Sequence, residues 1–161
     1  MGVEPRLATT SALTIIFAGE IADYLQTRLP HQQVISIDCE WTIGHKKADL
    51  LQIGLSDGRV YLFHLAKTQL MPLALKLLLQ SDTVKKVGNR IHNDVAKLKD
   101  WGVNVINTIE LGHLAHARTL VQTRAPRLST LVSVLFKGAT IEGKDSFGLW
   151  ATYKSMESML E

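Results

Sequence analysis

Two acidic residues that stand one residue apart, Asp38 and Glu40, carry the clearest chemical potential in this sequence. They end the apolar stretch "VISIDCE" at residues 34–40, whose composition and alternation predict a β-strand. Because side chains alternate along a strand, both carboxylates would project from one face, while Cys39 would point to the other. Paired carboxylates suit a hard divalent ion such as Mg²⁺ or Mn²⁺, although two acids at a strand end can also be simply solvated.

A third acid, Asp94, belongs to the stretch "KKVGNRIHNDVAKL" at residues 85–98. A short apolar strand ends there, and a helix is predicted to begin near Asn93. Asn93 or Asp94 can cap that helix, because both residue types accept hydrogen bonds from free N–H groups, and we assign the cap to Asn93. A strand-to-helix turn beside the centre of the sheet would also bring Asp94 toward Asp38 and Glu40.

The histidines and the cysteine form no comparable cluster. His113 and His116 stand three residues apart on a predicted helix without the other ligands of a zinc site, so surface or packing roles are expected. His64 ends an apolar strand and is expected to be structural, whereas His92 could lie at the rim of an active site. A thiol nucleophile is discounted because strand alternation turns Cys39 away from the acids.

Length and composition predict one soluble globular domain over residues 1–161. Hydrophobic residues make up 46% of the chain, yet no apolar run is long enough to span a membrane or arranged like a secretion signal. The single cysteine excludes an internal disulfide framework and is compatible with a reducing compartment. The pI near 9.1 permits contact with polyanions, and a solvated surface is the alternative account of the basic clusters, which are His45-Lys46-Lys47, Lys85-Lys86, and Arg118, Arg124 and Arg127.

The elements that must position the acids are mainly strands in the first part of the chain, and helices and strands alternate in the later part. Asp57-Gly58 predicts a hairpin, so the strands between residues 34 and 65 are expected to be antiparallel neighbours. This order predicts an α/β fold, with a mixed sheet and helices on its faces. The predicted strands are 13–17, 34–40, 50–56, 59–65, 85–88 and 103–107, and the predicted helices are 19–29, 72–80, one from about Asn93, 110–118 and 128–136.

Taken together, these stretches resemble the DEDD superfamily (DnaQ-like) of 3′–5′ exonucleases, most closely the Werner syndrome exonuclease group. The resemblance runs from about Thr14 to the last residue. "VISIDCEW" is similar to the first motif of the family and "IHNDVAKL" to the second, with Asp38, Glu40 and Asp94 at the acidic positions. "IELGHLA", "LSTLVSVLF" and "GKDSFGLW" resemble the helices that follow and the tryptophan that precedes the third motif.

The resemblance implies an RNase H-like sheet of about five strands with helices on both faces, and two-metal-ion hydrolysis of terminal phosphodiesters. It implies that Asp38 contacts both ions, that Glu40 holds the first ion and positions the attacking water, and that Asp94 supports the second ion through its water shell. Trp41 and Leu51 would line the pocket of the terminal nucleotide, with core packing as an equally good account of both. It also favours an intracellular, nuclear location.

Two departures from the family pattern stand out. Where relatives commonly have a glycine-rich stretch before the second motif, this chain has "VGNRI", so either the bulk alters the turn or Arg90 reaches a phosphate. The third motif, Tyr-x-x-x-Asp, is expected about twelve residues beyond Trp150, and the chain ends at Glu161. We therefore expect a C-terminally incomplete domain that lacks the last helix or part of it. Tyr153 and Glu157 have the four-residue offset of that motif but the wrong distance from Trp150.

Two hypotheses of function follow. The preferred one is a metal-dependent 3′–5′ exonuclease acting on the 3′ end of DNA or RNA, with activity impaired by the missing third motif. The alternative is a catalytically inactive module with a nuclease fold that binds nucleic acid or protein. A missing helix would leave apolar surface uncovered, so a protein partner or a further C-terminal segment is expected to cover it.

Overall fold

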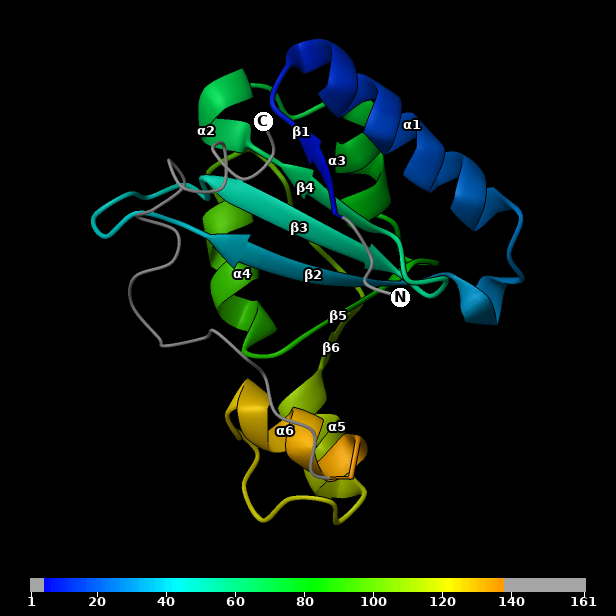
Figure 1. The fold of residues 1–161 in the computed structure, drawn as a ribbon, viewed down its shortest axis with the longest axis vertical. Coiled ribbons are helices and arrows are strands. Elements are labelled where there is room, and N and C mark those ends of the chain that lie inside the picture. Colours follow the sequence, from blue (N-terminus) through cyan, green and yellow to red (C-terminus); the bar gives the residue numbers. More distant parts are fainter. Residues whose placement is uncertain (1–4, 138–161) are drawn as a thin grey trace.

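Residues 5–137 are the part of the chain that the computed structural model describes, and they build a six-stranded sheet with helices packed against it (Figure 1). The sheet order is β1-β4-β3-β2-β5-β6. Its strands are β1 (Arg6–Ala8), β2 (Val34–Glu40), β3 (Leu50–Leu55), β4 (Val60–Phe63), β5 (Lys85–Gly88) and β6 (Thr108–Glu110).

The sheet is mixed, as the sequence predicts. The strands β2, β3 and β4 are antiparallel neighbours, and the Asp57-Gly58 hairpin between β3 and β4 is confirmed, with Gly58 at φ 92°. The pairs β2–β5, β5–β6 and β1–β4 are parallel. Six strands are present where about five were expected, and the short β1 forms one edge.

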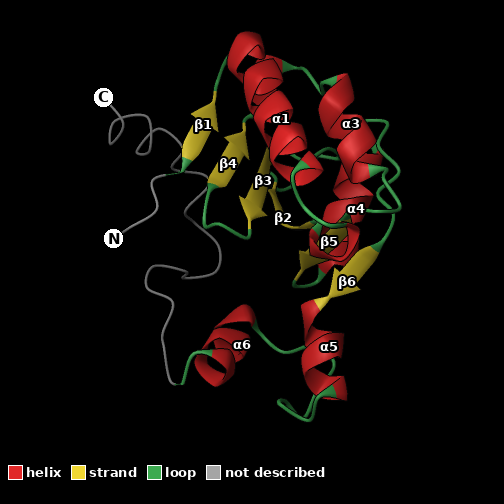
Figure 2. Cartoon of the chain, turned by 90° about the vertical axis from the view of Figure 1, so that its right-hand side faces the viewer, coloured by secondary structure: helices red, strands yellow, loops and turns green. Residues whose placement is uncertain are grey.

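Helices and strands are interspersed along the chain, and the length of the helices ranges from a single turn to sixteen residues. Figure 2 shows α1 and α3 side by side, while α5 and α6 lie beyond the β6 edge of the sheet in both views (Figures 1 and 2). No described helix is long and apolar enough to cross a membrane. The helices are α1 (Ser11–Gln26), α2 (Leu65–Thr68), α3 (Leu73–Leu79), α4 (Ile91–Lys99), α5 (Leu111–Ala117) and α6 (Leu128–Leu135), with a 3₁₀ turn at Pro30–Gln32.

The core lies against the face of β2 that carries Ile35, Ile37 and Cys39, all of them buried. The opposite face of the same strand carries an exposed serine followed by two partly exposed acids, Asp38 and Glu40. The alternation predicted for this strand is therefore confirmed. Other fully buried side chains of the core are Ile21, Leu51, Ile53, Tyr61, Phe63, Leu65, Leu75, Leu79 and Leu98.

The predicted strand at residues 13–17 is wrong, because these residues form the first half of α1. Thr10 caps the helix by accepting a hydrogen bond from the Leu13 backbone N–H at 3.2 Å. The two isoleucines that suggested a strand, Ile15 and Ile16, are 57% and 53% exposed. Phe17 and Ile21 supply the buried stripe instead, so tertiary packing outweighs the β-propensity of the isoleucine pair.

Two smaller predictions are also corrected. Residues 103–107 form no strand, although Val103 and Val105 are buried, and β6 begins at Thr108. The helix expected from Asn93 begins at Ile91, so Asn93 lies inside it and is not its N-cap. The expected loss of the last helix concerns residues 138–161, which lie outside the described residues.

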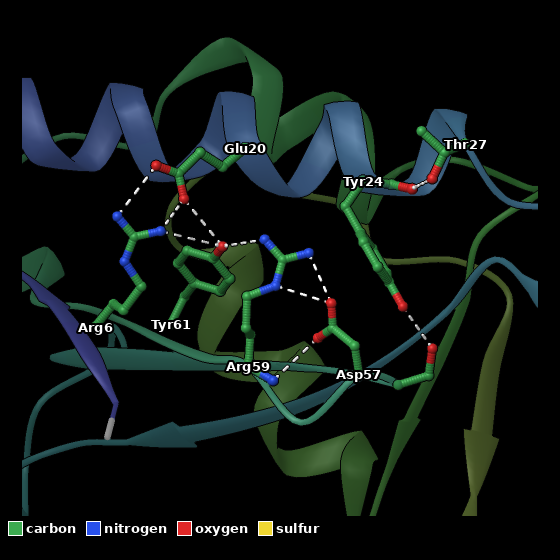
Figure 3. Close-up of polar contacts among 8 residues, drawn as sticks. Arg6, Glu20, Tyr24, Thr27, Asp57, Arg59 and Tyr61 are labelled. Atoms are coloured by element: carbon green, nitrogen blue, oxygen red, sulfur yellow. Dashed lines mark hydrogen bonds and ion pairs between the residues drawn. The ribbon is translucent and has the colours of Figure 1, made fainter. Parts of the chain in front are cut away.

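A polar network joins α1 to β1, β4 and the hairpin turn at the end of the sheet where β2 begins (Figure 3). Arg6 pairs with Glu20, and its Nη2 lies 3.1 Å from Glu20 Oε1. Tyr61 donates its hydroxyl to Glu20 at 3.0 Å and accepts from Arg59 at 3.1 Å, while Arg59 pairs with Asp57 at 2.8 Å. Opposite charges therefore alternate along the whole network.

Candidate active site

The two acids of the first predicted motif lie where β2 has a strand partner on one side only. Asp38 and Glu40 are paired with β3, opposite Gln52 and Leu50, whereas the pairing of β2 with β5 ends at Ser36. Gln52 Nε2 donates a hydrogen bond to Asp38 Oδ2 at 3.2 Å. The end of β2 therefore leaves backbone groups available to another element on the β5 side.

That element is α4, which brings the third acid to the end of β2. Asp94 lies in the first turn of α4, and its Oδ1 accepts a hydrogen bond from the Cys39 backbone N–H at 3.0 Å. Cys39 stands between the other two acids in the sequence, so Asp94 contacts the strand segment that carries Asp38 and Glu40. Gly88 permits this approach, because a Cβ there would lie 3.0 Å from the Ile37 carbonyl oxygen.

The electrostatics of this region are those of a crowded group of acids. Asp94 is 4% exposed, and burial, followed by the charges of Asp38, Glu40 and Glu110, raises its pKa to about 7, although the hydrogen bond from Cys39 opposes the shift. Burial, followed by the charges of Asp94, Asp38 and Glu40, raises the pKa of the Cys39 thiol well above its usual value. A raised pKa keeps the thiol protonated, in agreement with discounting a cysteine nucleophile.

Glu110, a residue that the sequence analysis did not select, holds the start of α4. Its carboxylate accepts hydrogen bonds from the backbone N–H groups of Arg90 and Ile91, both at 2.9 Å. The same side chain caps α5 by accepting from Gly112 N at 3.3 Å. Arg90 occupies the N-cap position of α4 with a left-handed φ of 58°, and its side chain caps no N–H group. Glu110, at the end of β6, provides the capping acceptor instead. An acid at the first position of the helix predicted over residues 110–118 was the available signal.

The remaining predicted substrate residues are spread around this region. Trp41 is half-buried, with Lys97 Nζ 4.9 Å from its ring centroid, and Leu51 is 0% exposed in the hydrophobic core. The location of Leu51 agrees with the core-packing account. Arg90 and His92 are exposed at the turn before α4 and in its first turn. Tyr153 and Glu157 lie outside the described residues.

The other histidines occupy structural or surface positions. His64 caps α2, since its Nδ1 accepts from the Lys67 backbone N–H at 3.0 Å. His116 Nδ1 lies 3.2 Å from the Val121 carbonyl oxygen, and His113 is exposed.

One residue of the predicted basic clusters, Lys86, is fully buried instead of lying on the surface. Its Nζ donates to two carbonyl oxygens, and burial lowers its pKa to about 8.

The donor chemistry of the three acids fits a hard divalent cation, because each offers carboxylate oxygens and their like charges call for a positive partner. Within residues 5–137, however, no three histidine, cysteine, aspartate or glutamate side chains converge closely enough to hold a metal ion. The described residues therefore supply a suitable set of ligands without a complete coordination shell.

Two curated relatives match somewhat under two thirds of the chain each. Over 117 residues it is 29% identical to the bifunctional 3′-5′ exonuclease/ATP-dependent helicase WRN of Mus musculus, a match that covers 65% of this chain and 8% of WRN. Over 100 residues it is 38% identical to exonuclease 3′-5′ domain-containing protein 2 of Drosophila melanogaster. This match covers 60% of this chain and 16% of the relative. The chain thus spans a small part of the length of either relative.

Solved structures show the same fold. A crystal structure of the EXD2 exonuclease domain soaked in Mg and dGMP has a TM-score of 0.62 at 23% identity, over 98% of this chain and 86% of that one. The form soaked in Mn and GMP has a TM-score of 0.60 at the same identity, over 98% and 85%. The family model described as 3′-5′ exonuclease matches residues 13–161. Since that match takes in nearly the whole chain and includes all three acids, the chain belongs to the 3′–5′ exonuclease family.

Proposed function

We propose that this domain hydrolyses the terminal phosphodiester at the 3′ end of a DNA or RNA strand and releases mononucleotides. The observation that carries the proposal is the hydrogen bond from Cys39 N–H to Asp94, because it ties the third acid between Asp38 and Glu40. Family membership supports the reaction type. The soaked EXD2 structures, in which Mg or Mn accompanies a guanine mononucleotide, support the pairing of a divalent metal with a nucleotide product.

Asp38, Glu40 and Asp94 would hold the metal, with Mg²⁺ or Mn²⁺ as the fitting ions and two ions in a complete site. When bound, such ions activate water and stabilise the leaving oxygen of a phosphodiester. In this proposal Asp38 would be a metal ligand, and Glu40 would help to hold a metal ion and would position the attacking water. Tyr153 and Glu157, as a substitute for the third motif, stay a prediction, as do Trp41, Leu51, Arg90 and His92 as substrate contacts.

The residues around the acids would prepare them for this task. Gln52 orients one oxygen of Asp38 through a hydrogen bond from its amide N–H. Asp94 has one oxygen on the Cys39 N–H and a raised pKa, so it needs a nearby cation to stay ionised at neutral pH. Glu110 fixes the helix start from which Asp94 projects.

The decisive experiment compares Asp38→Asn with Asp23→Asn in release of mononucleotides from a 3′-labelled oligonucleotide. Asp38→Asn removes a metal ligand while preserving size, so a fall of about 1,000-fold or more is expected. Asp23 is an exposed acid on α1 and serves as the charge-matched control, with activity equal to wild type. Equal activity of the two variants would overturn the proposed site, and a wild-type protein inactive with both Mg²⁺ and Mn²⁺ would overturn the reaction.

A second candidate function is a nucleic-acid- or protein-binding module without catalysis. It is favoured by the lack of three converging metal-binding side chains within residues 5–137. Asp38→Asn should then leave binding unchanged, and nucleic-acid affinity should fall steeply between 50 and 200 mM salt. Flat salt dependence would leave only a protein-binding role. Under either function, an intracellular, nuclear location is part of the proposal.

A further inference from the structure

The loop between β2 and β3, residues 41–49, starts directly after Glu40 and projects from the end of the sheet where β2 finishes (Figure 1). Its two ends are joined, because Asp49 N donates to the Glu40 carbonyl oxygen at 2.8 Å. The loop therefore leaves and re-enters the sheet beside one of the proposed metal ligands. Apart from Trp41 at its first position, no residue of this segment has a role in the proposed function.

The β2–β3 loop is held in one shape by contacts within it and with α4. Asp49 Oδ2 accepts hydrogen bonds from Thr42 N at 2.6 Å and Thr42 Oγ1 at 2.7 Å. Trp101, just after α4, donates its indole N–H to the Ala48 carbonyl oxygen at 2.8 Å. Lys97 of α4 donates to the His45 carbonyl oxygen. These links pre-organise the loop, and a pre-organised surface loses less entropy on binding.

What the loop presents to solvent is basic and apolar. Ile43 is 87% exposed, the most exposed of the large hydrophobic residues in residues 5–137. Lys46 and Lys47 are exposed, and neither forms an ion pair within the described part of the chain. The one carboxylate of the loop, Asp49, is occupied by His45 and Thr42, whose hydrogen bonds lower its pKa against the effect of burial.

A hollow of about 510 Å³ lies beside the loop, which forms part of its lining. Lys47 Nζ is 4.7 Å from the ring centroid of Trp101, which is half-buried in the wall of the hollow. A cation beside an aromatic ring, next to an exposed apolar side chain, is the combination that receives a phosphate together with an unstacked base. The lining residues include Lys46, Lys47, Asp49, Ala66, Gln69 and Trp101.

We propose that the β2–β3 loop binds single-stranded nucleic acid upstream of its 3′ end, with Lys46 and Lys47 on consecutive phosphates and Ile43 against a base. The inference deepens the proposed function and rests on nucleic acid being the substrate. A single strand fits better than a duplex, because an exposed isoleucine and a hollow beside tryptophan can take bases only when these are unpaired. The loop would hold the strand while its last phosphodiester lies at the acids.

The test measures binding of a fluorescent dT20 oligonucleotide, in EDTA to prevent cleavage, from 50 to 200 mM salt. Lys46→Ala/Lys47→Ala should lower affinity at least about tenfold at 50 mM and reduce the slope of log K against log salt by about 1.4. Ile43→Ser should weaken binding without changing that slope. Arg28→Ala/Lys85→Ala removes the same charge from the segment after α1 and from the first residue of β5, and should match wild type.

The outcomes separate this inference from the proposed function. Hydrolysis of a thymidine 5′-phosphate nitrophenyl ester, which has no upstream phosphates, should be unchanged in the lysine double variant. If wild type hydrolyses neither ester nor oligonucleotide, the nuclease proposal fails while the binding comparison still decides the role of the loop. Equal affinity of both double variants, a loss shared by the Arg28/Lys85 control, or equal competition by polyglutamate would overturn single-strand binding by this loop.

Discussion

The two ends of the central sheet differ in how their charged side chains are arranged. Where β2 begins, Arg6, Glu20, Arg59 and Asp57 alternate in sign around the Tyr61 hydroxyl (Figure 3). Where β2 ends, three acids gather; a backbone N–H donates to Asp94, and the Gln52 amide donates to Asp38. The first end is electrostatically satisfied by ion pairs within the chain, whereas at the second end neighbouring carboxylates raise the pKa of Asp94.

The pKa values follow this difference. At the first end, hydrogen bonds from Arg59 hold the pKa of Asp57 below its usual value, and the hydrogen bond to Glu20 raises that of Arg6. At the second end, burial and like charge raise the pKa of Asp94 to about 7. Unfavourable charge kept at one place is typical of functional sites, since a ligand of opposite charge can relieve it. The comparison therefore supports the proposal that the acidic end is the functional one.

The largest expected effect comes from Asp94→Asn. The asparagine oxygen can still accept from Cys39 N–H, so the fold should persist, but the ligand charge is lost and mononucleotide release should fall by about 1,000-fold or more. In metal-free protein the same variant should be more stable than wild type above pH 7. Oligonucleotide cleavage checks the loss of activity, and urea unfolding of the metal-free protein checks the gain in stability.

The sign of the stability effect follows from proton binding. An aspartate has a pKa near 3.9 in the unfolded chain and Asp94 has one of about 7 in the fold, so between these values the folded state binds more protons. Wild type should therefore lose stability as the pH rises from about 4 to about 7, by about 4 kcal/mol at most, and regain none above. Asp94→Asn should lack this slope. A slope that persists unchanged in the variant would contradict the raised pKa.

An intermediate effect is expected from Glu110→Ala, which removes the acceptor for Arg90 N and Ile91 N without touching the three acids. The free energy of unfolding should fall by about 1–3 kcal/mol, since the N–H groups of Arg90, Ile91 and Gly112 lose their acceptor. Exonuclease activity should fall by about tenfold or more, because displacement of α4 moves Asp94.

Hydrogen exchange at the start of α4 provides the structural measurement for Glu110. Faster exchange in Glu110→Ala, with partial recovery of exchange and activity in Glu110→Gln, is the expected pattern. The exposed His113 of α5 is the control position, and His113→Ala should change neither quantity. Unchanged exchange together with full activity in Glu110→Ala would remove Glu110 from the set of positioning residues.

The smallest effect is expected at the satisfied end of the sheet. Glu20→Gln weakens the contacts with Arg6 and Tyr61, and the partial exposure of the Arg6 and Glu20 side chains limits the loss to about 0.5–1 kcal/mol in the free energy of unfolding. Oligonucleotide cleavage should be unchanged, because this network lies at the other end of β2. A tenfold loss of cleavage with little loss of stability would show that the two ends are coupled.

Much of the fold could be predicted because its signals are local. The alternation along β2, the Asp57-Gly58 hairpin, and the helices α3, α5 and α6 were identified from periodicity and turn residues. The predicted strand at residues 13–17 failed for a physical reason. β-branched residues resemble a strand locally, whereas only packing against the sheet shows that Phe17 and Ile21 lie on one helical face.

The sequence by itself determined that Asp38 and Glu40 share one face, since that follows from the period of a single strand, and the family motifs marked Asp94 as their partner. Only the tertiary structure decided how Asp94 reaches them. Its contact with Cys39 spans 55 residues, and Glu110 holds α4 across 19 and 20 residues. Contacts of that span depend on how β5, α4 and β6 pack together, and no local pattern records that packing.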